Sequence, residues 1–505
     1  MIARLPLIFI TATLFAAPVI AQPASTPEKT ESKQPRLSTR QRTEKLAELA
    51  SKAFEAFRQG RHAEAETFLR EQLAIAPTDP IALYNLACVL GAQRKNDEAG
   101  IALAEAITNG YVDLRRIRRD PFVATARLQD APKSLIDNWP RTLDNALQRT
   151  IDLSQPLAPK SSPIRDETLK VAFLCAFDEQ SCTDARSEIT SIGTWAIANI
   201  FPTHNDSAEL ALDPWALIVL PTRAAFERWS TDTYGPRPAA SYHAVGGAYD
   251  HDTKRLIAQD LGSTLRHEFL HVLHWRDMTR RSQIHPVWVQ EGLCSLMEDY
   301  DFLPDGSLTP AHSWRTTTAK RLLGTGTLPS LSTLTAMTRE AFSQNRPLTN
   351  YALARTLFLY LHEQGKLGTF YSSLCSTYPE DPTGTLALER TFAKPISDIN
   401  TDFRAALRST PDIPEQITSG MASLGVEITA GTGEGPIVTL SPSASPLRSG
   451  DVLVGLNSPG QPLHPIRDIP ELIRLLSRQT PGDTIQVTLR RGKTRLTLDL
   501  PLVAK

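Results

Sequence analysis

The sequence shows no excess of charge of either sign, because 54 lysines and arginines stand against 55 aspartates and glutamates, for a net charge of −1. A nucleic-acid-binding protein normally carries a basic excess, so this balance argues against a nucleic-acid partner. Long apolar runs are also scarce. Only the first 21 residues contain one near the length that spans a bilayer, so we expect no membrane span beyond that segment.

Cysteine is rare as well, with five in 505 residues. Cys175 and Cys182 are close in the chain and could form a disulfide in an oxidising compartment, but the sequence does not decide this pairing, and the odd total leaves at least one free thiol. Cys294 stands in an apolar helical pattern, so we interpret it as a small core residue rather than a metal ligand.

The N-terminal segment has the pattern of an export signal. Arg4 precedes an apolar stretch from Leu5 to Ala17, and Val19-Ile20-Ala21 fits a signal-peptidase site. We therefore predict a signal peptide at residues 1–21 and, for a bacterial source, a periplasmic or secreted mature protein; an uncleaved N-terminal anchor is the alternative. Residues 22–42 are rich in Pro, Ser, Thr, Lys and Gln without an apolar period, which predicts a disordered linker.

Residues 43–150 carry helical patterns with an internal repeat. Arg61-His62-Ala63-Glu64-Ala65 and Lys95-Asn96-Asp97-Glu98-Ala99 are 34 residues apart, which is the period of tetratricopeptide repeats. The segment resembles two such repeats followed by further helices. The resemblance implies either a groove that binds peptides or protein partners, or a structural helical lid on the next domain.

The residues His267-Glu268-Phe269-Leu270-His271 form the pattern H-E-x-x-H. On a helix, positions i and i+4 share one face, so both imidazoles point at the same spot. Such a pair suits Zn²⁺, which accepts nitrogen ligands at about 2.0–2.1 Å. Glu268 stands beside the expected metal, where its carboxylate can take a proton from a metal-bound water. A core helix with incidental histidines would explain the neighbouring leucines but not the ionisable cluster, which is costly to bury unpaired.

A catalytic zinc usually keeps three protein ligands and one open position. Glu291 lies twenty positions after His271, in an expected second helix that begins near Pro286. The two helices resemble those of gluzincin metallopeptidases, and W-V-Q-E-G-L resembles the peptidase MA-like family in particular. The resemblance implies that Glu291 is the third zinc ligand. Asp277 is a rival, at the position of the last metzincin ligand, but His274 replaces the glycine that metzincins need, so we favour Glu291.

The sequence departs from the related thermolysin pattern in one place. Thermolysin-like enzymes carry an aspartate four positions after the third ligand to orient a histidine, and this chain has Ser295 there. Glu298 and Asp299 are the nearby carboxylates that would have to take that role, and the spacing does not choose between them.

A further helix is expected to begin with Asn350 as its cap. Peptidase MA-like proteins carry a similar Y-x-x-A-x-x-x-x-x-Y-L helix behind the active site, so the resemblance implies that Tyr351 donates a hydrogen bond to the oxyanion of the scissile carbonyl. A tyrosine half-buried against the core is the competing interpretation. His285 and Tyr300 are alternative donors.

Strand patterns precede the metal-binding helix, in an order that resembles the N-terminal sheet of gluzincins. There the edge strand pairs with an extended substrate. By this resemblance Gly247 and Ala248 contact the substrate backbone. The expected strands are 169–177 and 215–221, and the expected hairpin joins 244–249 to 255–258.

From Glu415 the pattern changes to β alternation around one helix at 469–478. Ser449-Gly450-Asp451-Val452-Leu453 and the hairpin at Arg491-Gly492-Lys493 resemble a PDZ domain of the bacterial protease-associated type. The resemblance implies that the backbone N–H groups of Leu424, Gly425 and Val426 receive a peptide carboxylate. Use of this domain as a spacer is the alternative.

These patterns together predict a multidomain protein with all-α helical repeats, an α+β zincin-like metallopeptidase core with a helical C-terminal subdomain, and a β-rich PDZ-like domain. The expected function is that of an exported metallopeptidase with one Zn²⁺ per chain and Glu268 as general base. The alternative is a non-catalytic envelope scaffold that binds protein partners through its helical repeats and PDZ-like domain. The expected segments are a signal peptide at 1–21, a linker at 22–42, a tetratricopeptide-like domain at 43–150, a catalytic domain at 164–410 and a PDZ-like domain at 415–505.

Overall fold

The computed structural model describes residues 38–201, 213–234, 246–251, 253–458 and 461–505. The chain forms two compact units. The predicted signal peptide and most of the predicted linker lie outside the described residues. None of the helices in the described ranges is long and apolar enough to cross a membrane. The first unit comprises residues 1–175, 206–218 and 224–257, and the second comprises 176–205, 219–223 and 258–505.

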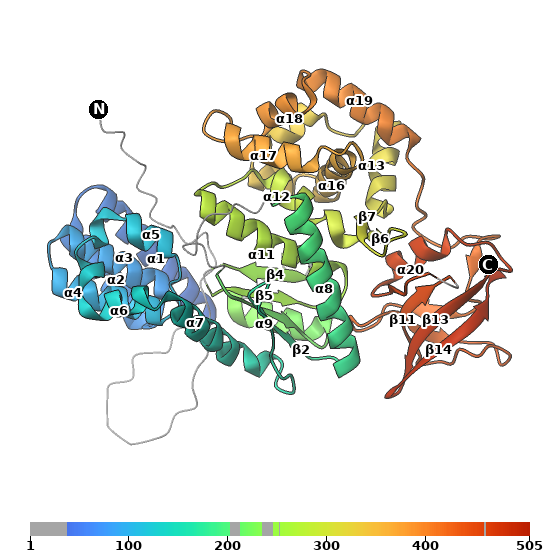
Figure 1. The fold of residues 1–505 in the computed structure, drawn as a ribbon, viewed down its shortest axis with the longest axis horizontal. Coiled ribbons are helices and arrows are strands. Elements are labelled where there is room, and N and C mark those ends of the chain that lie inside the picture. The colour runs from blue at the N-terminus through green and yellow to red at the C-terminus, as the bar shows by residue number, and fades with distance from the viewer. Residues whose placement is uncertain (1–37, 202–212, 235–245, 252, 459–460) are drawn as a thin grey trace. The chain divides into compact units, whose positions relative to one another are not determined.

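The first unit begins with a helical region whose helices pair in chain order (Figure 1). α1 starts four residues before the expected helical segment, because Ser38 and Gln41 form a capping box at its N-terminus. α2 begins at His62 and α4 at Asn96, which preserves the 34-residue spacing seen in the sequence. The elements are α1 (Thr39–Arg58), α2 (His62–Ile75), α3 (Pro80–Ala92), α4 (Asn96–Thr108), α5 (Leu114–Arg119), η1 (Pro121–Val123), η2 (Ala126–Leu128), α6 (Asp130–Asp137), α7 (Trp139–Ser154) and η3 (Gln155–Leu157).

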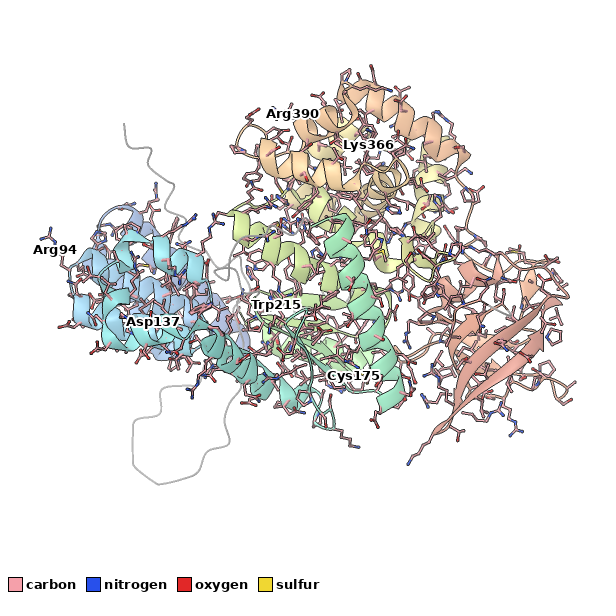
Figure 2. The ribbon with its side chains drawn as sticks, viewed as in Figure 1. Arg94, Asp137, Cys175, Trp215, Lys366 and Arg390 are labelled. Atoms are coloured by element: carbon pink, nitrogen blue, oxygen red, sulfur yellow. The ribbon has the colours of Figure 1, made fainter. Side chains whose placement is uncertain are left out.

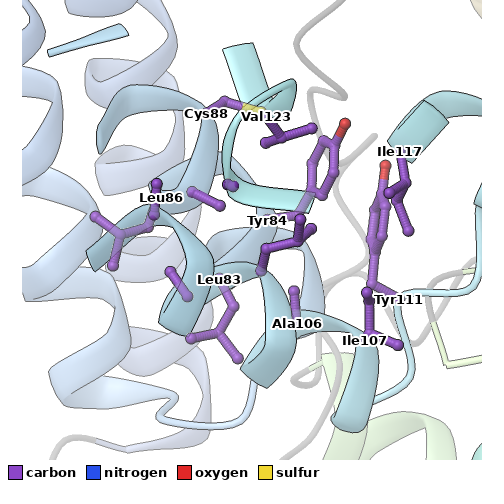
Figure 3. Close-up of a cluster of buried hydrophobic side chains, with 14 of the residues drawn as sticks. Leu83, Tyr84, Leu86, Cys88, Ala106, Ile107, Tyr111, Ile117 and Val123 are labelled. Carbon is purple, nitrogen blue, oxygen red and sulfur yellow. The ribbon is translucent and has the colours of Figure 1, made fainter. Parts of the chain in front are cut away.

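Aliphatic, small and aromatic side chains form the core of this helical region. Ala65 and Ala99, at equivalent places in the repeat, are both fully buried, so α2 and α4 each approach a neighbour closely. Figure 3 shows Tyr84 and Tyr111 side by side in the core, where their rings stack with centroids 4.0 Å apart. The buried residues of this core all lie between Ala53 and Ala146, which gives the region packing of its own.

The same unit contains a five-stranded sheet with the order β1-β2-β3-β5-β4. The expected strands are present but shorter, and the expected hairpin is confirmed as neighbouring strands β4 and β5. Trp215 at the start of β3 is fully buried. Figure 2 labels this residue and also Arg94, whose side chain projects from the helical region. The elements are β1 (Ile164–Asp166), β2 (Val171–Cys175), β3 (Trp215–Val219), α9 (Arg223–Tyr234), β4 (Gly247–Asp250) and β5 (Arg255–Ala258).

The second unit is mainly helical up to residue 409. α11 packs against both α8 and α12 (Figure 1). α16 begins at Pro347, so Asn350 is not the expected cap; it is buried inside the first turn and donates hydrogen bonds to the carbonyl oxygens of Phe342 and Asn345. The elements are α8 (Glu179–Asn199), α11 (Ser263–Arg281), α12 (Val287–Cys294), η5 (Leu296–Glu298), β6 (Tyr300–Phe302), β7 (Leu308–Pro310), α13 (Trp314–Gly324), α14 (Leu331–Thr335), α15 (Arg339–Gln344), α16 (Pro347–Glu363), α17 (Leu367–Thr377), α18 (Thr385–Phe392) and α19 (Ile396–Ser409).

The rest of the second unit is an antiparallel C-terminal β region. Its main sheet has the order β14-β13-β11-β10-β9, with β12 beside β11, and β15 pairs separately with β8. Its apolar core includes Leu453, Ile485 and Leu489, all fully buried. The elements are β8 (Ala422–Ser423), β9 (Glu427–Thr429), β10 (Ile437–Leu440), β11 (Val452–Asn457), β12 (His464–Pro465), α20 (Ile469–Leu476), β13 (Thr484–Arg491), β14 (Thr494–Pro501) and β15 (Val503–Ala504).

The structure describes all five cysteines. Cys175 and Cys182 are disulfide-bonded. Cys88, Cys294 and Cys375 are free and buried. Cys294 is fully buried in α12, which agrees with a core role for its side chain.

Candidate metal site

Helix α11 places two imidazoles at one spot. Leu265, Phe269 and Leu270 are fully buried and hold one face of the helix in the interior of the unit. His267 and His271 are one turn apart, and their Nε2 atoms are 3.1 Å from each other. This follows directly from the helical period, because residues four apart lie on the same face.

Helix α12 brings a carboxylate to the same spot. Oε2 of Glu291 lies 3.4 Å from Nε2 of His267 and 3.5 Å from Nε2 of His271.

Gly292, the residue after Glu291, allows α12 to pack closely against α16. A Cβ atom on Gly292 would lie 2.6 Å from Cδ2 of Phe358 and 2.9 Å from the carbonyl oxygen of Ala354, so only glycine permits this packing.

The three ligand atoms have the spacing that a tetrahedral zinc site requires. Bonds of about 2.0–2.1 Å at tetrahedral angles place two ligand atoms about 3.3–3.4 Å apart. The observed separations of 3.1, 3.4 and 3.5 Å bracket that value. Among the described residues, His267, His271 and Glu291 are the group that could hold a metal ion.

A second carboxylate orients the first histidine. Oε1 of Glu298 lies 2.9 Å from Nδ1 of His267, which leaves Nε2 facing the other two ligand atoms. Arg315 holds Glu298 in turn, with Nε 2.7 Å from Oε2 and Nη2 3.2 Å from Oε1. Ser295 does not replace the missing aspartate, because its hydroxyl donates to the carbonyl oxygen of Glu291. The carboxylate of Asp299 is paired with Arg355 instead of His267, at 3.7 Å from Nη2 of that arginine.

Arg315 was not foreseen from the sequence. It lies 17 residues after Glu298, in the first turn of α13, and no helical or strand period connects the two positions. Its side chain is identified only through the carboxylate that it contacts.

The charges of the site favour a cation at its centre. Three carboxylates, those of Glu268, Glu291 and Glu298, are buried around the two histidines. Burial disfavours the charged form of His267, yet hydrogen bonds to Glu291 and Glu298 outweigh it and raise the pKa of His267 to about 10. Burial also opposes charge on Glu298, but Arg315 and His267 hold its pKa down at about 2. A divalent metal would supply the positive charge that this arrangement of carboxylates favours.

Glu268 does not belong to the ligand group but lies beside it. Its side chain is buried, and burial raises the pKa of its carboxyl group while the imidazoles of His271 and His267 oppose the rise. Glu268 is thus buried beside the three residues that could hold a metal ion, without being one of them.

Tyr351 reaches the same cluster from α16. Burial, the negative charges of Glu291 and Glu268, and a hydrogen bond to Glu291 all raise the pKa of its phenol. The two alternative donors are engaged elsewhere. The Tyr300 hydroxyl donates to Glu188 at 3.0 Å, and Nδ1 of His285 lies 2.8 Å from Nε2 of His274.

Asp277, the rival third ligand, faces away from the two histidines of the pattern. Its carboxylate accepts hydrogen bonds from the Tyr371 hydroxyl and from Nε of Arg281, both at 2.7 Å, and it is also paired with Arg280. His274 contacts His285 rather than a metal ligand group. The structure therefore brings Glu291, and not Asp277, to the two histidines, while the Asp277 carboxylate is paired with arginines.

The remaining predicted residues lie in strands or at their ends. Gly247 and Ala248 begin β4, an edge strand of the sheet in the first unit. Leu424, Gly425 and Val426 follow β8 in the C-terminal β region, and Gly425 has a φ of 68°, which favours glycine. Their roles in binding substrate and peptide stay predictions.

Comparisons with known proteins give only distant similarity, to solved structures. No family model matches the sequence, and no curated protein matches it. A solved structure of an aminopeptidase N family protein from Idiomarina loihiensis is 14% identical, with a TM-score of 0.32. The match covers 68% of this chain and 67% of that chain.

Proposed function

We propose that this protein is a zinc-dependent metallopeptidase that hydrolyses bonds in peptide or protein substrates. The observation that carries the proposal is the group of His267, His271 and Glu291, whose ligand atoms lie 3.1–3.5 Å apart beside the buried Glu268. A structural zinc site is normally closed by four protein ligands, whereas a site with three leaves a position open for chemistry.

Zinc is the metal that suits this set of donors, since two imidazole nitrogens and one carboxylate oxygen are among its usual ligands. When bound there, zinc supplies a Lewis acid that polarises the scissile carbonyl and makes water more acidic. The expected stoichiometry is one zinc ion per chain.

The protein's own residues then carry the proton. The carboxylate of Glu268 accepts a proton from the attacking water as the water oxygen bonds to the carbonyl carbon. It returns that proton to the amine nitrogen as the C–N bond breaks. The Tyr351 hydroxyl, close to Glu291 and Glu268, donates a hydrogen bond to the oxyanion. The hydrogen bond from Nδ1 of His267 to Glu298 keeps Nε2 available as a ligand.

Three parts of the proposal rest on sequence patterns. The apolar N-terminal segment supports export to the periplasm or the medium, with an uncleaved anchor as the alternative. The edge strand β4 offers Gly247 and Ala248 for pairing with an extended peptide. The helical region and the loop at Leu424, Gly425 and Val426 are the parts of the chain that would bind protein partners or peptides.

The first experiment is elemental analysis of the purified protein after dialysis against a weak chelator. We expect about one zinc ion per chain. Glu268→Gln should keep that zinc and lose hydrolysis of a library of internally quenched peptides by about 100-fold or more, because general-base catalysis contributes about that much.

Two outcomes would reject the proposal. Protein without bound metal and without thermal stabilisation by added zinc would favour the non-catalytic scaffold. If the Glu268→Gln protein binds zinc and cleaves as fast as the wild type, the metal site stands but Glu268 is not the general base.

A further inference from the structure

Helix α20 in the C-terminal β region has two buried faces of different chemistry. Leu472, Leu475 and Leu476 belong to the apolar core of that region. Glu471 and Arg474 are also only 1% exposed, although both are charged. Buried charges are costly unless they are paired, so this polar face needs partners elsewhere in the second unit.

The partner of Glu471 is Arg266, the residue immediately before His267. Nη2 of Arg266 lies 3.4 Å from Oε1 of Glu471 and donates to the backbone carbonyl of Glu298 at 2.7 Å. Nη1 donates to Glu188 in α8 at 2.6 Å. One fully buried guanidinium therefore connects α20 to the metal-binding helix and to the backbone of the residue that orients His267.

Arg474 binds the segment that directly follows Glu298. Nη1 donates to Oδ1 of Asp301 at 2.6 Å, and Nη2 donates to the backbone carbonyl of Tyr300 at 2.8 Å. His464 supports the same segment, since its Nε2 atom lies 2.8 Å from that carbonyl oxygen and its ring stacks on Tyr300 at 5.0 Å. Nε of Arg474 also lies 3.6 Å from Oδ1 of Asp299. The C-terminal β region thus holds the backbone of Tyr300 and the side chains of residues 299–301.

We propose that Arg266, Glu471 and Arg474 are positioning residues of the metal site, so that the C-terminal β region is a structural part of that site. This inference rests on the proposed zinc function of His267, His271 and Glu291. The hydrogen bond between His267 and Glu298 is supported at both ends by these buried ion pairs. Arg266 precedes His267 and contacts Glu471, while residues 299–301 follow Glu298 and contact Arg474. Displacement of a ligand by about 1 Å weakens a preorganised site strongly.

The test compares two arginine variants of the full-length protein. Arg474→Gln removes the charge that binds the segment after Glu298. Arg491→Gln is the matched control, because Arg491 forms a two-bond pair with Asp451 in the same β region, at 2.8 Å for each bond, away from that segment. Zinc affinity is measured by competition with a chromophoric chelator, and ligand geometry by the visible absorption of the cobalt-substituted protein.

We expect Arg474→Gln to lower zinc affinity by about 10-fold, the lower end of the effect seen when a direct partner of a metal ligand is removed, and to change the cobalt spectrum. Arg491→Gln should lower the melting temperature while leaving zinc affinity and the cobalt spectrum unchanged. Equal zinc affinity and spectra in Arg474→Gln and the wild type would overturn the inference while leaving the proposed function intact. A wild type that binds no zinc would overturn the proposed function instead.

His464→Phe serves if Arg474→Gln does not fold. Phenylalanine keeps the stacking on Tyr300 and removes the hydrogen bond to its carbonyl oxygen. It also removes the contacts of Nε2 with Arg474 at 3.2 Å and of Nδ1 with the carbonyl oxygen of Pro465 at 3.0 Å. We expect a smaller loss of zinc affinity, about 3–10-fold, in a protein that folds normally. An unchanged affinity in this variant would count against the inference.

Discussion

Oε1 of Glu298 lies 2.9 Å from Nδ1 of His267, although the two residues are 31 positions apart in the chain. Arg315 holds the same carboxylate from a third helix, at 2.7 Å. The orientation of the first proposed ligand therefore depends on three elements, α11, η5 and α13, and not on the H-E-x-x-H helix alone.

Removing this orientation should weaken zinc binding without removing a ligand. Glu298→Gln and Arg315→Gln should each lower zinc affinity by about 10–100-fold. The first replaces the carboxylate that accepts from His267 by a weaker, neutral acceptor, and the second removes the guanidinium that holds this carboxylate in place. Competition with a chromophoric chelator measures the change. Arg321→Gln, on the exposed side of α13, is the control and should bind zinc like the wild type. Wild-type affinity in both test variants would show that Glu298 does not orient His267.

Substitution of the third ligand should separate Glu291 from its rival. Glu291→Gln should lower zinc affinity by more than about 100-fold, since loss of a ligand exceeds the effect of a residue behind it. Asp277→Asn should retain zinc, because Asp277 is paired with Arg281 and Tyr371. Metal content after dialysis distinguishes the two variants, and the reverse pattern would restore Asp277 as the ligand.

Loss of the Tyr351 hydroxyl should affect turnover more than binding. Tyr351→Phe should keep zinc and lower kcat by about 100-fold, with little change in KM, because an oxyanion donor acts mainly in the transition state. Steady-state kinetics on a cleaved peptide measure the two constants separately. An equal loss in KM with normal kcat would indicate that Tyr351 only binds substrate.

The contact between α12 and α16 should not tolerate a side chain at Gly292. Gly292→Ala should destabilise the protein by about 1–3 kcal/mol and reduce zinc retention, because the new methyl group meets Phe358 and the backbone of Ala354. Gly324→Ala is the control; no atom lies within 4 Å of its added Cβ, so it should be as stable as the wild type or more so. Thermal melting with and without zinc compares them, and identical melting of Gly292→Ala and wild type would exclude the tight packing.

Asp468, which caps α20, should make stability depend on pH. Burial and the nearby charges of Glu471 and Asp299 raise its pKa to about 7, with Arg266 opposing. The folded pKa lies above the ordinary value of about 3.9, so the protonated carboxyl group favours the folded state. This contribution to the free energy of unfolding is complete below about pH 4 and is lost as pH rises through 7. Asp468→Asn keeps a capping side chain and cannot ionise. At pH 4 this variant should have the same free energy of unfolding as the wild type. At pH 8 its free energy of unfolding should be higher by about 1–3 kcal/mol, measured by thermal melting at both pH values.

The control for this prediction is Asp398→Asn, an exposed substitution in the first turn of α19, which should not alter the pH dependence of melting. If Asp468→Asn and the wild type keep the same melting difference at pH 4 and pH 8, Asp468 does not titrate in this range.

The local features of the site could be predicted from the sequence because they depend on one helical period. His267, Glu268 and His271 share a helix, and the spacing alone places both imidazoles on one face. The expected hairpin and the buried Cys294 are of the same kind, since each reflects a short apolar pattern. The prediction that Asn350 caps a helix was wrong, because α16 starts one turn earlier, where Pro347 fits the first position of a helix.

Tertiary structure decided the contacts that join distant parts of the chain. Nothing in the spacing distinguishes Glu298 from Asp299 as the partner of His267, and nothing connects Arg266 to Glu471, 205 residues later. Such pairs form because buried charges must find opposite charges within hydrogen-bonding distance, and only packing determines which ones meet. The sequence by itself thus determined the helix that presents two imidazoles and a carboxylate. The tertiary structure decided what orients them, through buried ion pairs that no local pattern encodes.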